Sequence, residues 1–392
     1  MDNWQLSDHR WWYNFKIKDK NKIMSYFQFK NIRIAAVGAA VPKNRITVDS
    51  FKAEYADEMV DKFKESTGIK EFRRSIKYQT ASDFGYTAAN LILEKKSIDR
   101  KEIGALVFVA HSTDYRRPAT ACVLHKRLGL DKNCAAFDVN LGCSAFIYGV
   151  QIASSLMSCS DMKYALLVVG ETMTKITYPG DKAVSMLFGD GGGAILLEKT
   201  DNVHDEIKAM LKTDGTGYKA IIAPAGGFRN MDATHDVFVW KDGNPRTLYN
   251  TIMKGDDVFA FTISDVPRTI KEFLAKTNTD ANDYDCLAFH QANQFISKQL
   301  ARKLKVDPCK LPICLDRYGN TSAAAIPLTI CDAYGEDDLG KNINFLMSGF
   351  GVGLSWGVGS AIINTNDIYP VVETDEYFEE GVINSPEDYY KE

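Results

Sequence analysis

Three residues of this chain have side chains that could perform thioester chemistry together. Cys143 lies in the run FDVNLGCSAF, His290 in FHQAN and Asn320 in RYGNTSAAAIP. A cysteine thiolate is a strong nucleophile, and an imidazole and an amide are partners that a reactive thiol would need. The three motifs therefore predict thioester chemistry at Cys143.

The local pattern places Cys143 at the start of a helix. AAFDVN is typical of a strand, LGC of a tight turn, and SAFIYGVQIASSLM of a helix. Unpaired N–H groups and the helix dipole stabilise a thiolate there, so we expect a lowered pKa for the Cys143 thiol. The alternative is a buried cysteine that packs as a small apolar residue, and we interpret the other seven cysteines in this way.

His290 and Asn320 are predicted to lie at the carboxyl ends of strands, where the sites of α/β proteins assemble. His290 directly follows the strand CLAF, and Asn320 lies in the turn YGNTS before another helix. Taken alone, such a histidine is more often structural and an asparagine beside glycine usually forms a turn. Backbone N–H groups of GFGVG could join that of Cys143 to form an oxyanion hole.

We expect no metal site and no phosphate-binding loop. The remaining histidines show no metal-ligand spacing, and we interpret them as structural or surface residues; they are His9, His111, His125, His204 and His235. The glycine runs GDGGGA and GFGVGLSWG fit neither GxxxxGK[ST] nor GxGxxG after a strand, so they are typical of close-packed turns.

Short apolar runs alternate with helical periodicity, which predicts an α/β fold with parallel strands buried on both faces. Helices are expected after Ser82 as a possible cap, and around residues 266–273 and 296–304. The predicted strands are residues 105–110, 164–169, 194–198, 286–289, 343–347 and 360–364.

Two parts of the chain resemble each other, which suggests an internal duplication. DRKEIGALVFVAH (99–111) is similar to DYDCLAFH (283–290), and FGDGGGAILL (188–197) to FGVGLSWGVGSAII (350–363). The period is much longer than that of a solenoid repeat, so we predict two similar α/β halves. The predicted parts are an N-terminal extension (1–31), two halves (32–203 and 204–365) and an acidic tail (366–392).

Length, charge and composition exclude several classes of protein. With 392 residues the chain should form two domains or pseudo-domains, and no apolar stretch approaches the roughly 18 residues of a membrane span. The N-terminus shows no signal-peptide pattern and the cysteines form no CxxC pair, so we expect a cytoplasmic protein with reduced thiols.

The acidic residues are concentrated at the C-terminus. Nine acids and Lys391 give residues 367–392 a charge of −8, and we expect this tail to be solvated or loosely docked. The mildly basic remainder does not indicate nucleic-acid binding.

In their order along the chain, the motifs resemble those of the 3-oxoacyl-[acyl-carrier-protein] synthase III family of the thiolase superfamily. The resemblance covers residues 32–365 and also includes MKGDDVFAF (253–261). Asn320 favours this branch over elongating condensing enzymes, which have a second histidine there. Chalcone-synthase-like enzymes share the Cys-His-Asn triad but lack the HQAN and GNTSAA sequence motifs. The resemblance implies a homodimer with a thiolase-like fold, in which two similar α/β halves form five αβαβα layers.

The resemblance also implies a role for each residue. Cys143 attacks an acyl thioester and holds the acyl group, and the N–H groups of Cys143 and Val352 form the oxyanion hole. His290 and Asn320 stabilise the enolate that forms when a malonyl thioester loses CO₂, and this enolate attacks acyl-Cys143. No cofactor is expected, because the substrates are attached to coenzyme A or to the phosphopantetheine of an acyl carrier protein. The implied substrate-binding residues are Thr67, Gly255, Phe259, Asn293 and Arg117.

Departures from the family pattern bear on the donor of the acyl group. Lys62 and Ser66 stand where relatives clasp the adenine of coenzyme A with Trp and Arg, and Phe295 replaces an arginine that commonly contacts the donor. Delivery by a carrier protein is one explanation. Basic residues after Phe295 could face an acidic carrier, or they could form an ordinary solvated helix face; they are Lys298, Arg302, Lys303 and Lys305.

Arg117 lies near the place where relatives use an apolar residue of the neighbouring subunit to close the acyl pocket, which suggests a short or polar primer. The favoured function is a decarboxylative condensation in fatty-acid initiation or a specialised pathway. An alternative enzyme passes the acyl group from Cys143 to an alcohol, an amine or a second β-keto acid. A binding or scaffold protein without catalysis is a third possibility, which the intact Cys143, His290 and Asn320 disfavour.

Overall fold

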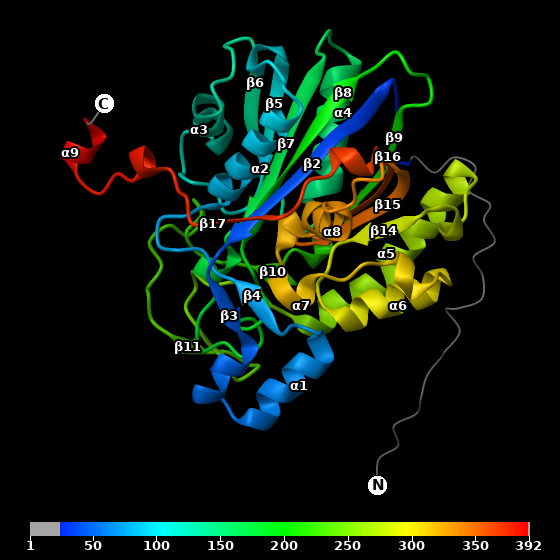
Figure 1. Ribbon diagram of the computed structural model, residues 1–392. Coiled ribbons are helices and arrows are strands. Elements are labelled where there is room, and N and C mark those ends of the chain that lie inside the picture. Colours follow the sequence, from blue (N-terminus) through cyan, green and yellow to red (C-terminus); the bar gives the residue numbers. More distant parts are fainter. Residues whose placement is uncertain (1–23, 391–392) are drawn as a thin grey trace.

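Two sheets form the centre of the molecule (Figure 1). The computed structural model describes residues 24–390; residues 1–23 and 391–392 lie outside the described part. The first sheet has the strand order β17 (Val372–Thr374), β2 (Ile32–Pro42), β8 (Gly191–Lys199), β7 (Tyr164–Glu171), β5 (Ile103–Val109) and β6 (Ala135–Val139). The second has the order β1 (Tyr26–Lys30), β9 (Glu206–Thr213), β16 (Ser355–Asn364), β15 (Asn342–Gly351) and β14 (Cys286–Phe289).

Helices cover both faces of each sheet and produce five layers. They are α2 (Ala81–Lys95), α3 (Thr120–Arg127), α4 (Ala145–Ser158), α5 (Gly255–Thr277), α6 (Gln294–Leu304) and α8 (Ala325–Tyr334). Helices α4 and α8 lie between the sheets and contact both. Helices α2 and α3 pack on the outer face of the first sheet, and α5 and α6 on that of the second (Figure 1). The predicted α/β fold with αβαβα layers is confirmed, but the prediction of parallel strands is only partly right, because β8 and β16 are antiparallel to both of their neighbours.

Shorter elements connect these layers. They are α1 (Asp57–Thr67), α7 (Leu315–Tyr318), α9 (Pro386–Tyr389), and the strand pairs β3 (Arg45–Thr47) with β4 (Glu71–Arg73), β10 (Ile221–Ile222) with β13 (Ile252–Met253), and β11 (Phe238–Val239) with β12 (Pro245–Arg246). Among residues 24–390, no helix combines the length and apolar character needed to cross a membrane.

All six strands predicted from apolar runs are present, as β5, β7, β8, β14, β15 and β16. The predicted cap of α2 is wrong, because the helix begins at Ala81 and Ser82 lies within its first turn. Thr80 precedes the helix, and its backbone N–H donates to the Asp83 carboxylate at 2.7 Å. The long strand β2 was not predicted, because alanine is depleted in strands. Its pairing with β8 and the burial of every residue except Arg33 determine its conformation.

The chain passes from the first sheet to the second between β8 and β9, the interval that contains the predicted boundary at residues 203/204. A strand near each end of the described chain lies in the sheet of the opposite half. Strand β1, near the N-terminus, pairs with β9 in the second sheet, and β17, near the C-terminus, pairs with β2 in the first.

The acidic tail is docked against the first half, which corrects the expectation of a solvated or loosely docked extension. The Glu373 carboxylate lies 2.8 Å from the guanidinium of Arg73, a buried side chain. The Gln79 side-chain amide donates to the carbonyls of Thr374 and Glu376 at 3.1 and 3.0 Å. The tail is held because its backbone and its acids find partners on the first half.

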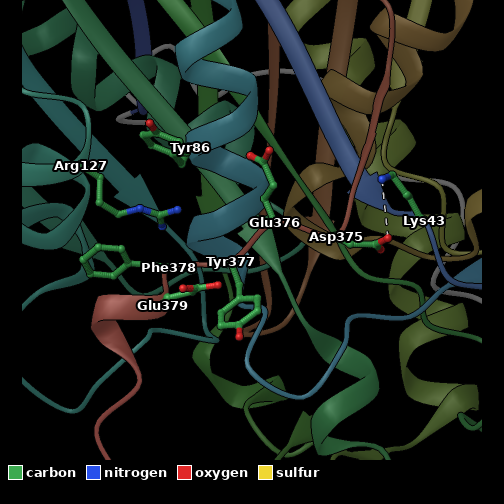
Figure 2. A pocket seen from close by; sticks show the side chains of 8 residues that line it. All are labelled: Lys43, Tyr86, Arg127, Asp375, Glu376, Tyr377, Phe378 and Glu379. Carbon is green, nitrogen blue, oxygen red and sulfur yellow. Dashed lines mark ion pairs between the residues drawn. The ribbon is translucent and has the colours of Figure 1, made fainter. Parts of the chain in front are cut away.

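A further contact anchors the tail at Phe378. Figure 2 shows the Arg127 guanidinium between the rings of Tyr86 and Phe378, at 4.4 and 4.9 Å from the ring centroids. The same guanidinium lies 3.0 Å from the buried Asp83 carboxylate. The Phe378 backbone N–H also donates to Asp83, at 2.9 Å. One buried ion pair of the first half is therefore covered by an aromatic residue of the tail.

Candidate active site

A cavity of about 130 Å³ contains all three predicted catalytic side chains. Cys143, His290 and Asn320 line it together with Val352. Most of the other lining residues are apolar, among them Met173, Leu187, Phe188, Ile221, Phe259 and Phe350. Cys143 and Ser322, which lie 179 positions apart in the chain, therefore share one mostly apolar space.

Cys143 reaches this cavity from the turn between β6 and α4, two residues before the helix begins. Glycines of β15 permit the close approach of two backbones. A Cβ atom at Gly349 would lie 2.8 Å from the Cys143 carbonyl oxygen, and one at Gly351 would lie 2.8 Å from the Cys143 Sγ. The Sγ lies 3.4 Å from the Ser322 Oγ, and it contacts the N–H groups of Cys143 and Val352.

The pKa of the Cys143 thiol is raised to about 11, so the lowered pKa predicted from the helix start is wrong. Burial is the main cause, since it favours the neutral thiol, and the charge of the Glu171 carboxylate acts in the same direction. The Ser322 hydroxyl and the N–H groups of Cys143 and Val352 partly oppose this effect. Desolvation outweighs these hydrogen bonds at this position.

His290 follows β14 directly, as predicted, and its ring is buried. The backbone N–H of His290 donates to the Ser348 carbonyl at 2.8 Å, and Phe350 packs edge to face on the ring, with 5.2 Å between the centroids. Burial lowers the pKa of His290 to about 4, and a backbone hydrogen bond with Ser322 partly opposes the shift. The imidazole is therefore neutral at neutral pH. Its Nδ1 is buried and has no hydrogen-bond partner in residues 24–390.

Asn320 is held at its backbone and at one side-chain atom. Its N–H donates to the Leu187 carbonyl at 2.9 Å, and its own carbonyl accepts from the Gly189 N–H at 3.1 Å. The side-chain Oδ1 accepts from the Ser322 N–H at 3.0 Å. Because the oxygen of the amide is engaged in this way, the NH₂ group is the end that can donate to a ligand in the cavity.

Three of the predicted substrate-binding residues also line the cavity: Gly255, Phe259 and Asn293. Gly255 and Phe259 come from the first two turns of α5. Asn293 caps α6, with its Oδ1 accepting from the Ile296 N–H at 2.8 Å. Phe295, which is half exposed, packs against Phe259 with its ring tilted and 5.9 Å between the ring centroids.

Thr67 and Arg117 do not line the cavity. Thr67 ends α1, where its hydroxyl donates to the Phe63 carbonyl at 2.7 Å and accepts from the Ile69 N–H at 3.2 Å. Arg117 is exposed in the loop between β5 and α3. A substrate-binding role for these two residues stays a prediction.

His111 lines the cavity, which corrects its interpretation as a structural or surface residue. It lies just beyond the end of β5, with Ala110 between them, while His290 directly follows β14. The similarity of residues 99–111 to residues 283–290 was the signal that could have identified it, since both segments end in histidine. Ser322, whose hydroxyl contacts the Cys143 Sγ, was also missed, although it lies in the motif RYGNTSAAAIP.

Comparisons with known proteins agree with this arrangement. Residues 137–215 match the family "3-Oxoacyl-[acyl-carrier-protein (ACP)] synthase III", and residues 274–364 match its C-terminal part. A beta-ketoacyl-[acyl-carrier-protein] synthase III of Caldanaerobacter subterraneus is 33% identical over 82% of this chain and 95% of its own length. A putative 3-oxoacyl-[acyl-carrier-protein] synthase 3 of Campylobacter jejuni is 31% identical over 87% of this chain and 96% of its own.

A solved structure shows the same fold. The crystal structure of a 3-oxoacyl-(acyl-carrier protein) synthase from Burkholderia xenovorans superposes with a TM-score of 0.83 at 32% identity, covering 90% of this chain and 99% of that one. Relatives above 30% identity thus match the chain over nearly their whole length. The chain belongs to the 3-oxoacyl-[acyl-carrier-protein] synthase III family, a family of acyl-transferring condensing enzymes with a thiolase-like fold.

Proposed function

We propose that this protein condenses an acyl thioester primer with a malonyl thioester through an acyl-Cys143 intermediate, in fatty-acid initiation or in a specialised lipid or polyketide pathway. The observation that supports this most directly is the shared cavity. It combines a thiol, a neutral imidazole and an amide whose NH₂ group is free to donate. These groups suit chemistry in which negative charge develops on a thioester oxygen.

In the first half-reaction, Cys143 takes the acyl group from its carrier. The new bond joins the acyl carbon to the Cys143 Sγ, the bond to the carrier sulfur breaks, and the thiol proton leaves on the released carrier. The N–H groups of Cys143 and Val352 donate hydrogen bonds to the oxyanion of the tetrahedral intermediate. Their contact with the Sγ in the resting protein supports this role, because it places two donors beside the reacting atom.

In the second half-reaction, a malonyl thioester occupies the space beside acyl-Cys143. The bond to the carboxylate breaks and CO₂ leaves, while the electron pair forms an enolate whose oxygen accepts hydrogen bonds from His290 and Asn320. The enolate carbon attacks the acyl carbon, and the Cys143 sulfur departs and regains a proton. The product is a 3-oxoacyl thioester that is two carbons longer than the primer. No cofactor takes part.

The carrier of the primer is proposed to be an acyl carrier protein. The residues that would clasp an adenine are replaced by Lys62 and Ser66, and the Ser66 hydroxyl donates to the Phe63 carbonyl within α1. Four basic side chains are exposed on and just after α6, the helix that Asn293 caps beside the cavity: Lys298, Arg302, Lys303 and Lys305. An acidic carrier could dock on this surface and direct its thioester past Asn293.

The proposal includes a homodimer. Arg117 is exposed in its own chain, and in the dimer it would approach the acyl end of the partner's cavity. A charged side chain at that place favours a short or polar primer over a long unbranched one. Sedimentation at several concentrations tests the dimer, and acylation by primers of increasing length tests the role of Arg117.

The two half-reactions can be separated by changing Asn320. Asn320→Ala removes the amide, while Asn320→Asp keeps an oxygen for the Ser322 N–H and replaces the NH₂ donor with a second carboxyl oxygen. We expect both variants to acquire an acyl group on Cys143, as measured by mass spectrometry. We expect malonyl decarboxylation to fall by about 100-fold to 1,000-fold, the usual cost of losing one oxyanion donor.

Unchanged malonyl decarboxylation in both variants would contradict the assignment of Asn320. Failure of wild-type Cys143 to form an adduct with any acyl-coenzyme A or acyl-carrier-protein donor would contradict the proposed function and favour a binding role. The mass of the product distinguishes condensation from transfer to an alcohol, an amine or a second β-keto acid.

A further inference from the structure

We propose that His111 selects an acyl primer with a hydroxyl group, because its ring presents an unpartnered hydrogen-bond acceptor beside Cys143. This inference rests on the proposed function and specifies its primer class. It is supported by the position of His111, by one contact that fixes its backbone and another that fixes its ring, and by the buried Nε2 atom of this ring, which lines the same cavity as the reacting thiol.

His111 lies at the carboxyl end of the first sheet, next to the nucleophile. Strands β5, β6 and β7 are parallel neighbours, and His111, Cys143 and Glu171 are placed at or just beyond their ends. The buried Glu171 carboxylate accepts from the N–H groups of His111 and Ser112 at 2.8 and 3.1 Å, and from the Ser112 hydroxyl at 2.6 Å. Glu171 therefore fixes the backbone from which the imidazole projects.

The second contact fixes the ring itself. The His111 Nδ1 is hydrogen-bonded to the Asn140 Oδ1, which can only accept, so the Nδ1 has the proton. In the neutral ring the Nε2 then has a lone pair and acts as an acceptor. Among residues 24–390 this buried Nε2 has no hydrogen-bond partner. A buried polar atom of this kind in a cavity is suited to a ligand that supplies the missing donor.

The Nε2 is also close to the reacting atoms. A Cβ atom at Gly142 would lie 2.9 Å from the His111 Nε2 and 3.2 Å from the Ser322 Oγ, the hydroxyl that contacts the Cys143 Sγ. Only the lack of a side chain at Gly142 allows the imidazole to approach so closely. An acyl group on Cys143 therefore begins in the same cavity as this acceptor.

The cavity limits the size of that acyl group. Its volume of about 130 Å³ is small beside the roughly 300–1,000 Å³ of ordinary ligand pockets. A short acyl chain fits this space, and a hydroxyl near its thioester carbonyl supplies the donor that the Nε2 lacks. A 3-hydroxyacyl group of four carbons combines these properties, whereas an unsubstituted chain would leave the Nε2 unpaired.

The test compares acylation of Cys143 by 3-hydroxybutyryl, butyryl and 3-oxobutyryl thioesters, each on coenzyme A and on acyl carrier protein, by time-resolved mass spectrometry. The three groups have similar size and differ in the ability of the third carbon to donate. We expect wild-type protein to be acylated by the hydroxyacyl donor about tenfold faster than by the butyryl donor. His111→Phe keeps a ring of similar shape and should remove this preference. His204→Phe, a change at an exposed histidine, is the matched control and should keep it.

Equal or faster acylation of the wild-type protein by the butyryl donor would overturn the inference, and this result does not depend on the folding of any variant. A preference for the 3-oxobutyryl donor would also overturn it, because that group only accepts. An equal loss of acylation by all three donors in His111→Phe would show that His111 has a general role in acylation, and it would overturn the inferred selectivity for a hydroxyl group. Absence of acylation by all three donors, and by acetyl and longer acyl thioesters, would instead contradict the proposed function.

Discussion

At the scale of single residues, the site pairs a neutral thiol with a neutral imidazole. A thiolate–imidazolium pair requires a thiol pKa below that of the imidazole, and here the order is reversed, with values of about 11 for Cys143 and about 4 for His290. Burial causes both shifts, since it penalises the charged form of each group. His290 is therefore suited to donate a hydrogen bond to an oxyanion rather than to act as the resting base of the thiol.

The raised thiol pKa predicts how the reactivity of Cys143 depends on pH. Only the thiolate reacts with iodoacetamide, so its alkylation should be slow at neutral pH and increase about tenfold per pH unit toward alkaline pH. Mass spectrometry of the Cys143 peptide after short exposures measures the rate, with the exposed Cys159 as internal reference. A rate that already levels off below about pH 8 would show that the thiolate is stabilised in the folded protein.

At the scale of elements, the end of β15 determines where the thiol lies. A Cβ atom at Gly351 would lie 2.6 Å from the Cys143 Cβ and 2.8 Å from its Sγ, distances that real Cβ atoms do not adopt. The turn between β6 and α4 and the end of β15 can therefore pack together only while position 351 has no side chain. Val352, whose N–H contacts the thiol, immediately follows this glycine.

Gly351→Ala should displace the thiol and reduce acylation of Cys143 by at least about 100-fold, because misplacement of a reacting atom by about 1 Å has this effect. The free energy of unfolding should fall by about 1–3 kcal/mol through overpacking. Gly215→Ala is the matched control, since a Cβ there meets nothing within 4 Å. Normal acylation in Gly351→Ala would mean that the strand end moves aside freely.

At the scale of the whole molecule, the two ends of the described chain join the halves to each other. Strand β1 extends the second sheet and β17 extends the first, so each half is completed by a segment from the opposite end of the sequence. The tail then continues to Phe378, which covers the Arg127–Asp83 ion pair, and to Gly381, whose carbonyl accepts from Tyr115 at 2.5 Å. The tail thereby contacts the loop that follows β5.

Phe378→Ala should lower the free energy of unfolding by about 1–2 kcal/mol, since a cation–π contact on a desolvated guanidinium contributes about 0.5–2 kcal/mol and apolar contact is lost as well. Urea denaturation measures the change. Phe228→Ala removes a ring that is 74% exposed and serves as control. Equal stability of the two variants would show that the tail contributes nothing to folding through this contact.

Strands that are continuous apolar runs were predictable from the sequence, because β5, β7 and β14 have local patterns that are independent of distant partners. Strand β2 was not, since its alanine-rich segment becomes a strand through pairing with β8, which follows it by about 150 residues. The docking of the tail was also missed. A count of acidic residues contains no information about the basic and aromatic groups that Glu373 and Phe378 meet on the first half.

The sequence by itself determined the family, the order of the motifs and the identity of Cys143, His290 and Asn320 as candidates, because motifs and strand patterns depend on neighbouring residues. Only the tertiary structure decided the protonation states of these residues and which side chains lie beside them. The Cys143 Sγ meets Ser322 across 179 residues, and burial by distant elements reversed the pKa shift expected from the local helix start. His111 also lines the cavity that contains the Cys143 thiol. Packing at the ends of the strands, rather than spacing along the chain, determines which side chains share a cavity.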